Sequence, residues 1–357
     1  MNIFYIYVLF IAIYFSLCQM SYEEIELNFG EDNSNKMFIR TINETHVIVG
    51  TEKNIAILDL VNKELKNDSI FSSIIINGMI EPFLVNTTDM KILIYEDIGH
   101  NSHGYNLNTK EKFSHGNYFN KIHSINFYKT DRVFIIGEHT DGKEIGFILF
   151  EPKNEGNKKQ EFLEVSSSYD VTSSYEVTSI NIHDKLLIFY YYDKYFSVAM
   201  LNETEVFSIK NELSLTIDNQ NDYKISHLLT INIQTDYILG VFFEEKSSIF
   251  YAFLTQIGNT DPYILKSNNI SVCQKIDEQY YERINDVNEV YLYLYKMNDN
   301  IAFFAFQKTN TMYYRKITID IDKEQLSFLQ LNSSNYLTTT VINENIVIFG
   351  KKKDNKF

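Results

Sequence analysis

The apolar residues of this chain fall in short runs that polar residues separate, a pattern typical of β-strands. The clearest unit spans residues 37–65, where apolar runs at 37–42, 46–50 and 54–60 are separated by the polar trios 43–45 and 51–53. Runs this short, rich in Ile and Val and divided by turn-forming residues, predict an antiparallel meander rather than a helix. Val47, Ile48 and Val49 are consecutive and apolar, so we expect both faces of the middle strand to be covered.

The same order of elements recurs along the chain: a strand, a turn of Asn, Asp or Thr, an all-apolar strand, a polar turn and a third strand. The all-apolar strands after the first are KILIY (91–95), RVFIIG (132–137), KLLIFYYY (185–192), YILGVFF (237–243), IAFFAF (301–306) and IVIFG (346–350). The turns before them lie about 42 to 63 residues apart, a spacing expected of propeller blades. We therefore predict an all-β fold, a seven-bladed β-propeller, with two packed sheets as the alternative.

The last predicted blade contributes only two strands before a Lys-rich tail at 351–357. Residues 21–29 alternate Ile25, Leu27 and Phe29 with polar residues, as in a half-buried strand. We predict that this N-terminal strand closes the last blade beside Ile346 or Ile348, because closure removes two exposed sheet edges. The propeller domain then spans 19–350.

Two segments depart from the repeat. Ser167–Thr172 and Ser173–Thr178 form a near-perfect hexapeptide duplication, which with 154–160 indicates a polar surface insertion between the third and fourth blades. Residues 2–17 are almost wholly apolar, as in the hydrophobic region of a signal peptide. Ser16 and Cys18 fit cleavage before Gln19, so we predict a signal peptide at 1–18 and an extracellular, secreted protein, with an uncleaved N-terminal anchor as the alternative.

Composition narrows the classes of function. The 357 residues carry a net charge of −15, with 26 Tyr, 27 Phe, 3 Pro and no Trp. The aromatic content supports a large core and argues against disorder. The acidic balance argues against binding to nucleic acid, whose phosphates attract clustered Lys and Arg, and against an anionic membrane surface. No stretch after the signal segment approaches the length of a membrane helix.

Cysteine and sequon positions fit a secretory route. Cleavage removes Cys18 and leaves Cys273 alone, so an internal disulfide is excluded in the mature chain and Cys273 is either buried or paired between chains. Six N-glycosylation sequons begin at Asn43, Asn67, Asn86, Asn202, Asn269 and Asn332. About five are expected by chance in a chain this rich in Asn, Ser and Thr, so their number proves nothing.

One loop-rich stretch gathers half of the eight histidines: His100, His103, His115 and His123. Imidazoles near Glu96 and Asp97 are the ligand types of a divalent-metal site, which makes His100, His103 and His115 weak metal candidates. The segments 102–104 and 114–116, both Ser-His-Gly, instead indicate paired turns flanking a strand. No spacing matches a known metal motif, and we predict no bound metal or cofactor.

Acidic residues also fail to form a catalytic pattern. A propeller glycosidase needs two or three carboxylates directed into its channel. The recurrent acids lie instead in turns between strands and are better explained as turn caps: Asp89, Asp131, Asp184, Asp236 and Asp299. No nucleophile motif is present, and Trp, the usual sugar-stacking residue, is absent. A carbohydrate hydrolase with channel-facing carboxylates remains the alternative function.

Tyrosines form a stripe in YLYLY, where Tyr291, Tyr293 and Tyr295 share one side of a strand. We interpret them as strand core, with an exposed aromatic patch for a partner as the alternative.

Two segments resemble the sema domain, the seven-bladed propeller of semaphorins and plexins. Residues 46–60, HVIVGTEKNIAILDL, resemble its opening blade, and residues 336–350 resemble its last blade; residues 242–253 are more loosely similar to plexin segments. The chain departs from the family in length and in lacking its disulfides. The resemblance implies extracellular protein–protein recognition without catalytic residues, and we expect a protein partner and no enzyme activity.

Overall fold

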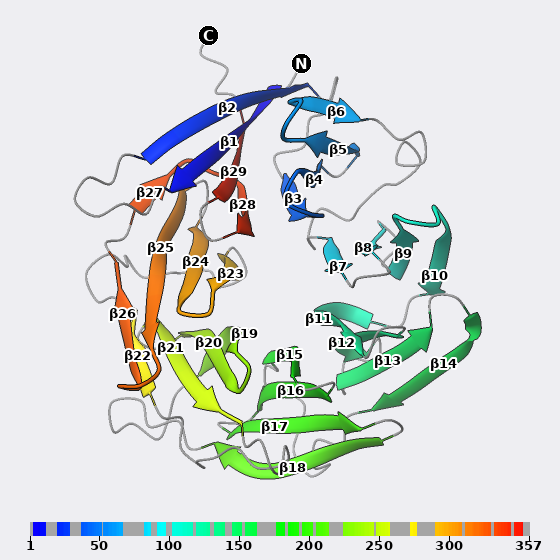
Figure 1. Cartoon of the computed structure of the whole chain (residues 1–357). Helices are drawn as coiled ribbons and strands as arrows, with labels where there is room; N and C mark the ends of the chain where they lie inside the picture. Colours follow the sequence, from blue (N-terminus) through cyan, green and yellow to red (C-terminus); the bar gives the residue numbers. More distant parts are fainter. Residues whose placement is uncertain are drawn as a thin grey trace.

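The computed structural model describes most of the chain, with gaps. The described residues are 3–11, 20–28, 37–51, 53–66, 82–86, 91–97, 102–116, 119–128, 132–139, 145–151, 154–162, 176–182, 185–192, 195–202, 205–213, 224–245, 248–257, 272–276, 290–308, 311–329, 332–343 and 346–352. Within these ranges the regular structure is all β, in antiparallel sheets (Figure 1).

The described strands form seven sheets, and six of them use strands that follow one another in sequence. The first is β3 (Phe38–Thr41), β4 (His46–Gly50), β5 (Ile55–Asp59) and β6 (Glu64–Lys66). The second is β7 (Phe83–Asn86), β8 (Lys91–Glu96), β9 (Ser102–Asn106) and β10 (Lys112–Gly116). The third is β11 (Phe119–Tyr128), β12 (Arg132–His139), β13 (Ile145–Glu151) and β14 (Asn154–Phe162). The predicted all-apolar strands are therefore second strands of four-stranded sheets.

The remaining sheets follow the same plan. The fourth is β15 (Glu176–Ile182), β16 (Lys185–Tyr192), β17 (Tyr195–Asn202) and β18 (Glu205–Leu213); the fifth is β19 (Ile225–Gln234), β20 (Tyr237–Glu244), β21 (Ile249–Gln256) and β22 (Val272–Lys275). The sixth is β23 (Val290–Asn298), β24 (Ile301–Lys308), β25 (Thr311–Asp320) and β26 (Gln325–Phe328), and β27 (Asn332–Ser334) pairs with β25. The last sheet combines β28 (Thr338–Asn343) and β29 (Ile346–Lys352) with β1 (Ile3–Ile11) and β2 (Met20–Asn28).

The first strand of each sheet lies at the centre of the molecule and the later strands lie progressively outward (Figure 1). Neighbouring first strands contact one another in sequence order from β3 to β28, and β28 contacts β3. Polar side chains join several of these strands. Ser124 Oγ lies 2.7 Å from Ser179 Oγ, and Thr41 Oγ1 lies 2.9 Å from Thr340 Oγ1. Side-chain hydrogen bonds therefore connect some of the neighbouring first strands at the centre.

The strand predicted at 21–29 belongs to the same sheet as β28 and β29, but it does not pair with β29. The strand β1 lies between them and pairs with β29 on one edge and β2 on the other. Ile25 and Leu27 are buried while Glu24 and Glu26 are exposed, so the predicted alternation is confirmed at these positions. Phe29 lies outside the described residues.

The core lies between adjacent sheets. Val47, Ile48 and Val49 are all fully buried, as the sequence predicts. Val47 and Val49 pack in a cluster that contains Ile25, Leu27 and Ile348, whereas Ile48 packs with Leu93 of the second sheet. A second strand therefore needs apolar side chains on both faces, because each face meets a neighbouring sheet.

Two predictions about local structure are wrong. Residues 154–162 are the outermost strand of the third sheet, paired with β13, and not a surface insertion. An outermost strand has little apolar surface to cover, so its sequence NEGNKKQEF lacks the apolar pattern of an inner strand. The Ser-His-Gly segments are not turns either, because they lie in β9 and β10 and pair with each other, Ser114 opposite His103. The duplicated residues 167–175 lie outside the described residues.

Candidate functional site

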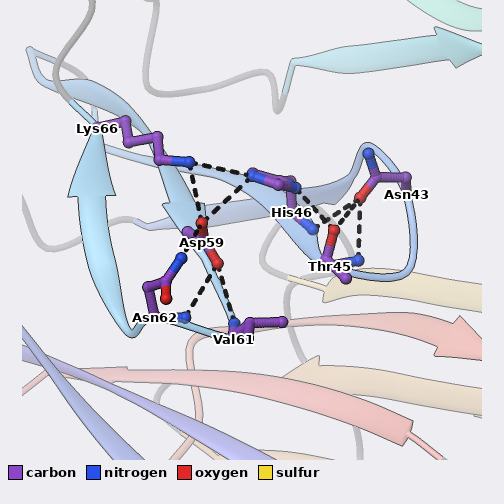
Figure 2. A network of polar contacts seen from close by, with 7 residues as sticks. All are labelled: Asn43, Thr45, His46, Asp59, Val61, Asn62 and Lys66. Atoms are coloured by element: carbon purple, nitrogen blue, oxygen red, sulfur yellow. Dashed lines mark hydrogen bonds and ion pairs between the residues drawn. The ribbon is translucent and has the colours of Figure 1, made fainter.

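A network of polar contacts lies at one end of the first sheet, where β4, β5 and β6 meet (Figure 2). The register places His46 opposite Asp59, and Asp59 opposite Glu64 across the next hairpin. Asp59 is the last residue of β5, and His46 is the first of β4. Asn43 lies in the connection between β3 and β4. We call these residues, together with Thr45, Val61, Asn62 and Lys66, the Asp59 network.

Asp59 is the hub of the network. Its Oδ1 accepts hydrogen bonds from the backbone N–H groups of Val61 and Asn62, both at 3.0 Å. Its Oδ2 accepts from Asn62 Nδ2 and from Lys66 Nζ, both at 2.9 Å. The backbone bond from Asn62 and the bond from Lys66 favour the ionised form, so they hold the pKa of the Asp59 carboxyl well below its usual range.

His46 connects Asp59 to the preceding turn. Its Nδ1 lies 2.8 Å from Thr45 Oγ1, and its Nε2 lies 3.4 Å from Lys66 Nζ. Thr45 Oγ1 donates to Asn43 Oδ1 at 3.1 Å, which uses the single hydroxyl proton. With Thr45 oriented in this way, Nδ1 of His46 donates to Oγ1. Nε2 also lies 3.6 Å from Asp59 Oδ2, so His46 links the Asp59 carboxylate to Thr45 and Asn43.

The Asp59 turn recurs in two other sheets. Asn106 Oδ1 accepts from the backbone N–H groups of Asn108 and Thr109, and Asp320 Oδ1 accepts from that of Lys323. The residue four positions after each acceptor has a positive φ: Lys63 at 58°, Lys110 at 62° and Glu324 at 50°. Because the same turn follows the third strand in three sheets, we interpret it as a structural feature of the hairpin and not as a binding site. The Asp59 network therefore stabilises a hairpin.

The sequence contains this repeated turn, which the sequence-based prediction did not identify. DLVNKE, NLNTKE and DIDKEQ each start with Asp or Asn, continue with an apolar residue, and place the positive-φ residue fifth. Asp and Asn side chains at the first position of a turn accept hydrogen bonds from the backbone two and three residues later, so these three turns could have been predicted from the sequence.

The structure brings only part of the histidine group together. His103 Nε2 lies 2.8 Å from Asp97 Oδ2, and the His103 ring stacks on Tyr95 with centroids 5.4 Å apart. Burial, followed by the Asp97 carboxylate, raises the pKa of Tyr95 to about 12. His100 lies outside the described residues, and His115 is described only as part of β10.

His123 is separate from that pair. It lies at a bulge in β11, and its Nε2 is 3.1 Å from Glu138 Oε1 of β12. The described residues contain no group of three or more His, Cys, Asp or Glu side chains arranged to hold a metal ion. Cys273 lies in β22 opposite Phe253, and its predicted burial or interchain pairing stays a prediction.

Two of the five turn acids are described. Asp236 and Asp299 lie in the turns after β19 and β23, and Asp299 pairs with Lys296 Nζ at 2.7 Å. Asp89, Asp131 and Asp184 lie outside the described residues.

The tyrosine stripe packs into the core, as we interpreted it. Tyr293 is buried in a cluster with Phe303 and Phe349, and Tyr291 and Tyr295 pack against the same cluster. The Tyr295 hydroxyl donates to the backbone oxygen of Thr339 at 3.0 Å. The stripe therefore joins the sixth sheet to the last one, and the alternative of an exposed patch is wrong.

The sequons occupy different environments. Asn43 is exposed in a hairpin connection, and Asn332 is exposed in β27. Asn86 and Asn202 are the last residues of β7 and β17, and their side chains are not described. Asn67 and Asn269 lie outside the described residues.

The first strands of the seven sheets carry one acidic residue among them, Glu176 of β15. Their other polar side chains include several that bond to the neighbouring first strand: Ser124 and Asn126 to Ser179, Thr178 to Thr230, and Asn181 to the backbone of Phe127. In the described part of the chain, no helix is long and apolar enough to cross a bilayer.

Comparison with known proteins identifies the fold but no family. No family model matches the sequence, and no curated protein matches it. Among solved structures, U3-55K superposes with a TM-score of 0.53 at 7% identity, covering 90% of this chain and 97% of that one. The RRP9 WD40 repeats give 0.52 at 7% identity over 91% and 96% of the two chains. Hsv2p of Kluyveromyces lactis gives 0.51 at 9% identity over 88% and 89%.

These similarities and the sheet arrangement show a β-propeller fold. The predicted propeller class is therefore confirmed. The sema resemblance finds no support among the three structures, and it stays a prediction.

Proposed function

We propose that the chain is a seven-bladed β-propeller that acts outside the cell as a protein-interaction module without catalysis. The N-terminal residues complete the ring by joining the sheet of β28 and β29. Its binding partner is another protein, of the extracellular kind that the sema resemblance implies.

The observation that carries this proposal is the composition of the central strands. A channel-sited glycosidase requires at least two convergent carboxylates, whereas Glu176 is the sole acid on the described first strands. The hydroxyl groups of Ser124, Ser179 and Thr178 are hydrogen-bonded to hydroxyl groups of neighbouring first strands. These contacts support a central region that holds the ring together, which leaves binding to the outer surfaces.

Signal-peptide cleavage, which the proposed secretory route involves, would change the strands of the last sheet. Cleavage before Gln19 would remove β1, which pairs with both β2 and β29. A cleaved protein must then complete the sheet with β2 alone, and an uncleaved protein keeps β1 as the third strand. The mass of the intact secreted protein distinguishes the two, because the forms differ by eighteen residues.

The test of function is affinity capture by the full chain, secreted from a eukaryotic host, followed by identification of bound proteins. Heat-unfolded bait is the control that removes proteins bound to exposed core. The same protein is assayed against a glycan library beside Glu176→Gln. We expect a protein captured by folded bait alone and no sugar release. Sugar release that Glu176→Gln abolishes, with no captured protein, would replace the module by the hydrolase.

A further inference from the structure

Asn43 has a side chain whose two polar atoms face opposite environments. Its Oδ1 accepts three hydrogen bonds within the turn: from the backbone N–H groups of Thr45 at 2.9 Å and His46 at 2.8 Å, and from Thr45 Oγ1 at 3.1 Å. Its Nδ2 points away from Thr45 and His46 (Figure 2). The residue is exposed, so the amide nitrogen faces solvent.

The orientation of this amide follows from its partners. Two of the three contacting groups are backbone N–H groups, which can only donate. The atom that receives them must be the carbonyl oxygen, and the nitrogen must occupy the outer position. The Asn43 amide is therefore held with its nitrogen outward.

Asn43, Glu44 and Thr45 also form a glycosylation sequon, and a modified Asn carries its glycan on Nδ2. The Thr45 hydroxyl, which the sequon requires, already donates a hydrogen bond to Asn43 Oδ1. All of the Asn43 contacts are made within three residues, so the turn needs no distant part of the chain to form. A glycan on Nδ2 leaves each of these hydrogen bonds intact.

Asn332 provides a contrast inside the same chain. It begins the sequon Asn332-Ser333-Ser334, but these residues form β27, which pairs with β25. An extended strand paired with a neighbouring strand of its own sheet lacks the turn found at Asn43.

We propose that Asn43 is an N-glycosylation site whose acceptor geometry the β3–β4 turn sets. The donor is an oligosaccharide linked through a diphosphate to a lipid. A bond forms between Asn43 Nδ2 and the anomeric carbon, the carbon–oxygen bond to the diphosphate breaks, and the diphosphate leaves with that electron pair. The amide proton is released. The inference rests on the proposed secretory route, because the donor and transferase are found there.

The test compares two forms of the full chain in a secretory host: one with its own N-terminus and one preceded by a heterologous cleavable leader. Released glycopeptides are treated with an N-glycan amidase in heavy-oxygen water, which marks each occupied Asn by mass. Asn43→Asp is the matched control, because it keeps an acceptor oxygen for the backbone of Thr45 and His46 but lacks Nδ2. Thr45→Ala removes the sequon hydroxyl, and Thr45→Ser retains it.

We expect Asn43 to be marked in the parent and in Thr45→Ser, at higher occupancy than Asn332, and not in Thr45→Ala. Asn43→Asp should be secreted and should melt like the deglycosylated parent. Occupancy only behind the heterologous leader would support the site and contradict the proposed secretory route. An unmarked Asn43 in both forms, with folded protein secreted, would overturn the inference. Thr45→Ala with unchanged occupancy would do the same.

Discussion

Lys66 Nζ lies 2.9 Å from Oδ2 of Asp59 across the β5–β6 hairpin, on a carboxylate whose other oxygen already accepts two backbone N–H groups. The bonds that hold the turn are therefore bonds to an ionised group. Charge-assisted bonds of this kind favour the ionised form and are lost when the group is protonated.

The first prediction concerns the thermal stability of the protein at low pH. The pKa of Asp59 is lower in the folded protein than its ordinary value of 3.8. Asp59 therefore contributes stability that is fully present above the unfolded pKa and is lost as the pH falls through the folded pKa. We expect Asp59→Asn to lower the melting temperature at pH 7. Below pH 3.8 the difference from the parent should shrink as the pH falls, and thermal melting from pH 7 to pH 2 measures it. A difference that stays constant over this range would show that the carboxylate charge does not stabilise the turn.

The second prediction concerns the contact of β2 with its neighbours. Leu27 is fully buried in a cluster with Val47, Leu58 and Ile348. We expect Leu27→Ala to lower the free energy of unfolding by about 2–5 kcal/mol, because it removes buried side-chain volume and leaves a cavity. Glu24→Ala, on the exposed face of the same strand, should change it by less than about 0.5 kcal/mol. Equal effects from the two substitutions in chemical denaturation would show that β2 does not pack here.

The third prediction concerns Gly240 in the middle of β20. A Cβ at this position would overlap the ring of Phe253, which is fully buried on the paired strand β21. We expect Gly240→Ala to destabilise the fold by about 1–3 kcal/mol. The double variant with Phe253→Leu should lose less than the sum of the two single variants, since the smaller side chain frees the space. Additive losses would indicate that the two positions are not in contact.

The fourth prediction uses the recurrent hairpin. Glu324 has a φ of 50° in the turn after Asp320, a conformation that costs a residue with a Cβ about 1–2 kcal/mol. We expect Glu324→Gly to be neutral or stabilising by up to about 1 kcal/mol, because the relief is partly offset by the entropy of glycine. Ser327→Gly, in the exposed part of β26, should lose about 0.5–1 kcal/mol. The reverse order in denaturant melts would contradict the shared turn geometry.

The sequence predicted the strands whose burial follows a clear pattern of apolar residues. The consecutive apolar residues Val47, Ile48 and Val49 indicated a strand covered on both faces, and the alternation at Ile25 and Leu27 indicated a strand covered on one face. The outermost strand 154–162 gave no such signal, because it lies at the edge of its sheet, and its polar sequence resembled a loop. The strand β1 was hidden for a different reason: its continuous apolar run has the composition of a signal peptide.

The candidate site was less predictable. The bonds of Asp59 to Val61 and Asn62 are local and follow from the chemistry of the turn residues. The approach of His46 to Asp59 depends on the register of β4 against β5, which no spacing in the sequence specifies. The weak metal candidates His100, His103 and His115 stay untested as a group, because His100 lies outside the described residues and the side chain of His115 is not described.

The central claim is that N-terminal residues complete the sheet of β28 and β29. Amide hydrogen exchange of residues 346–352 tests it most directly, measured for the full chain and for a variant lacking residues 1–28. In the full chain β29 is hydrogen-bonded on both edges, to β28 and to β1. We expect slow exchange along this strand, and fast exchange of alternate amides in the truncated variant, because one edge loses its partner. Residues 346–352 that exchange equally in the two proteins would contradict the closure.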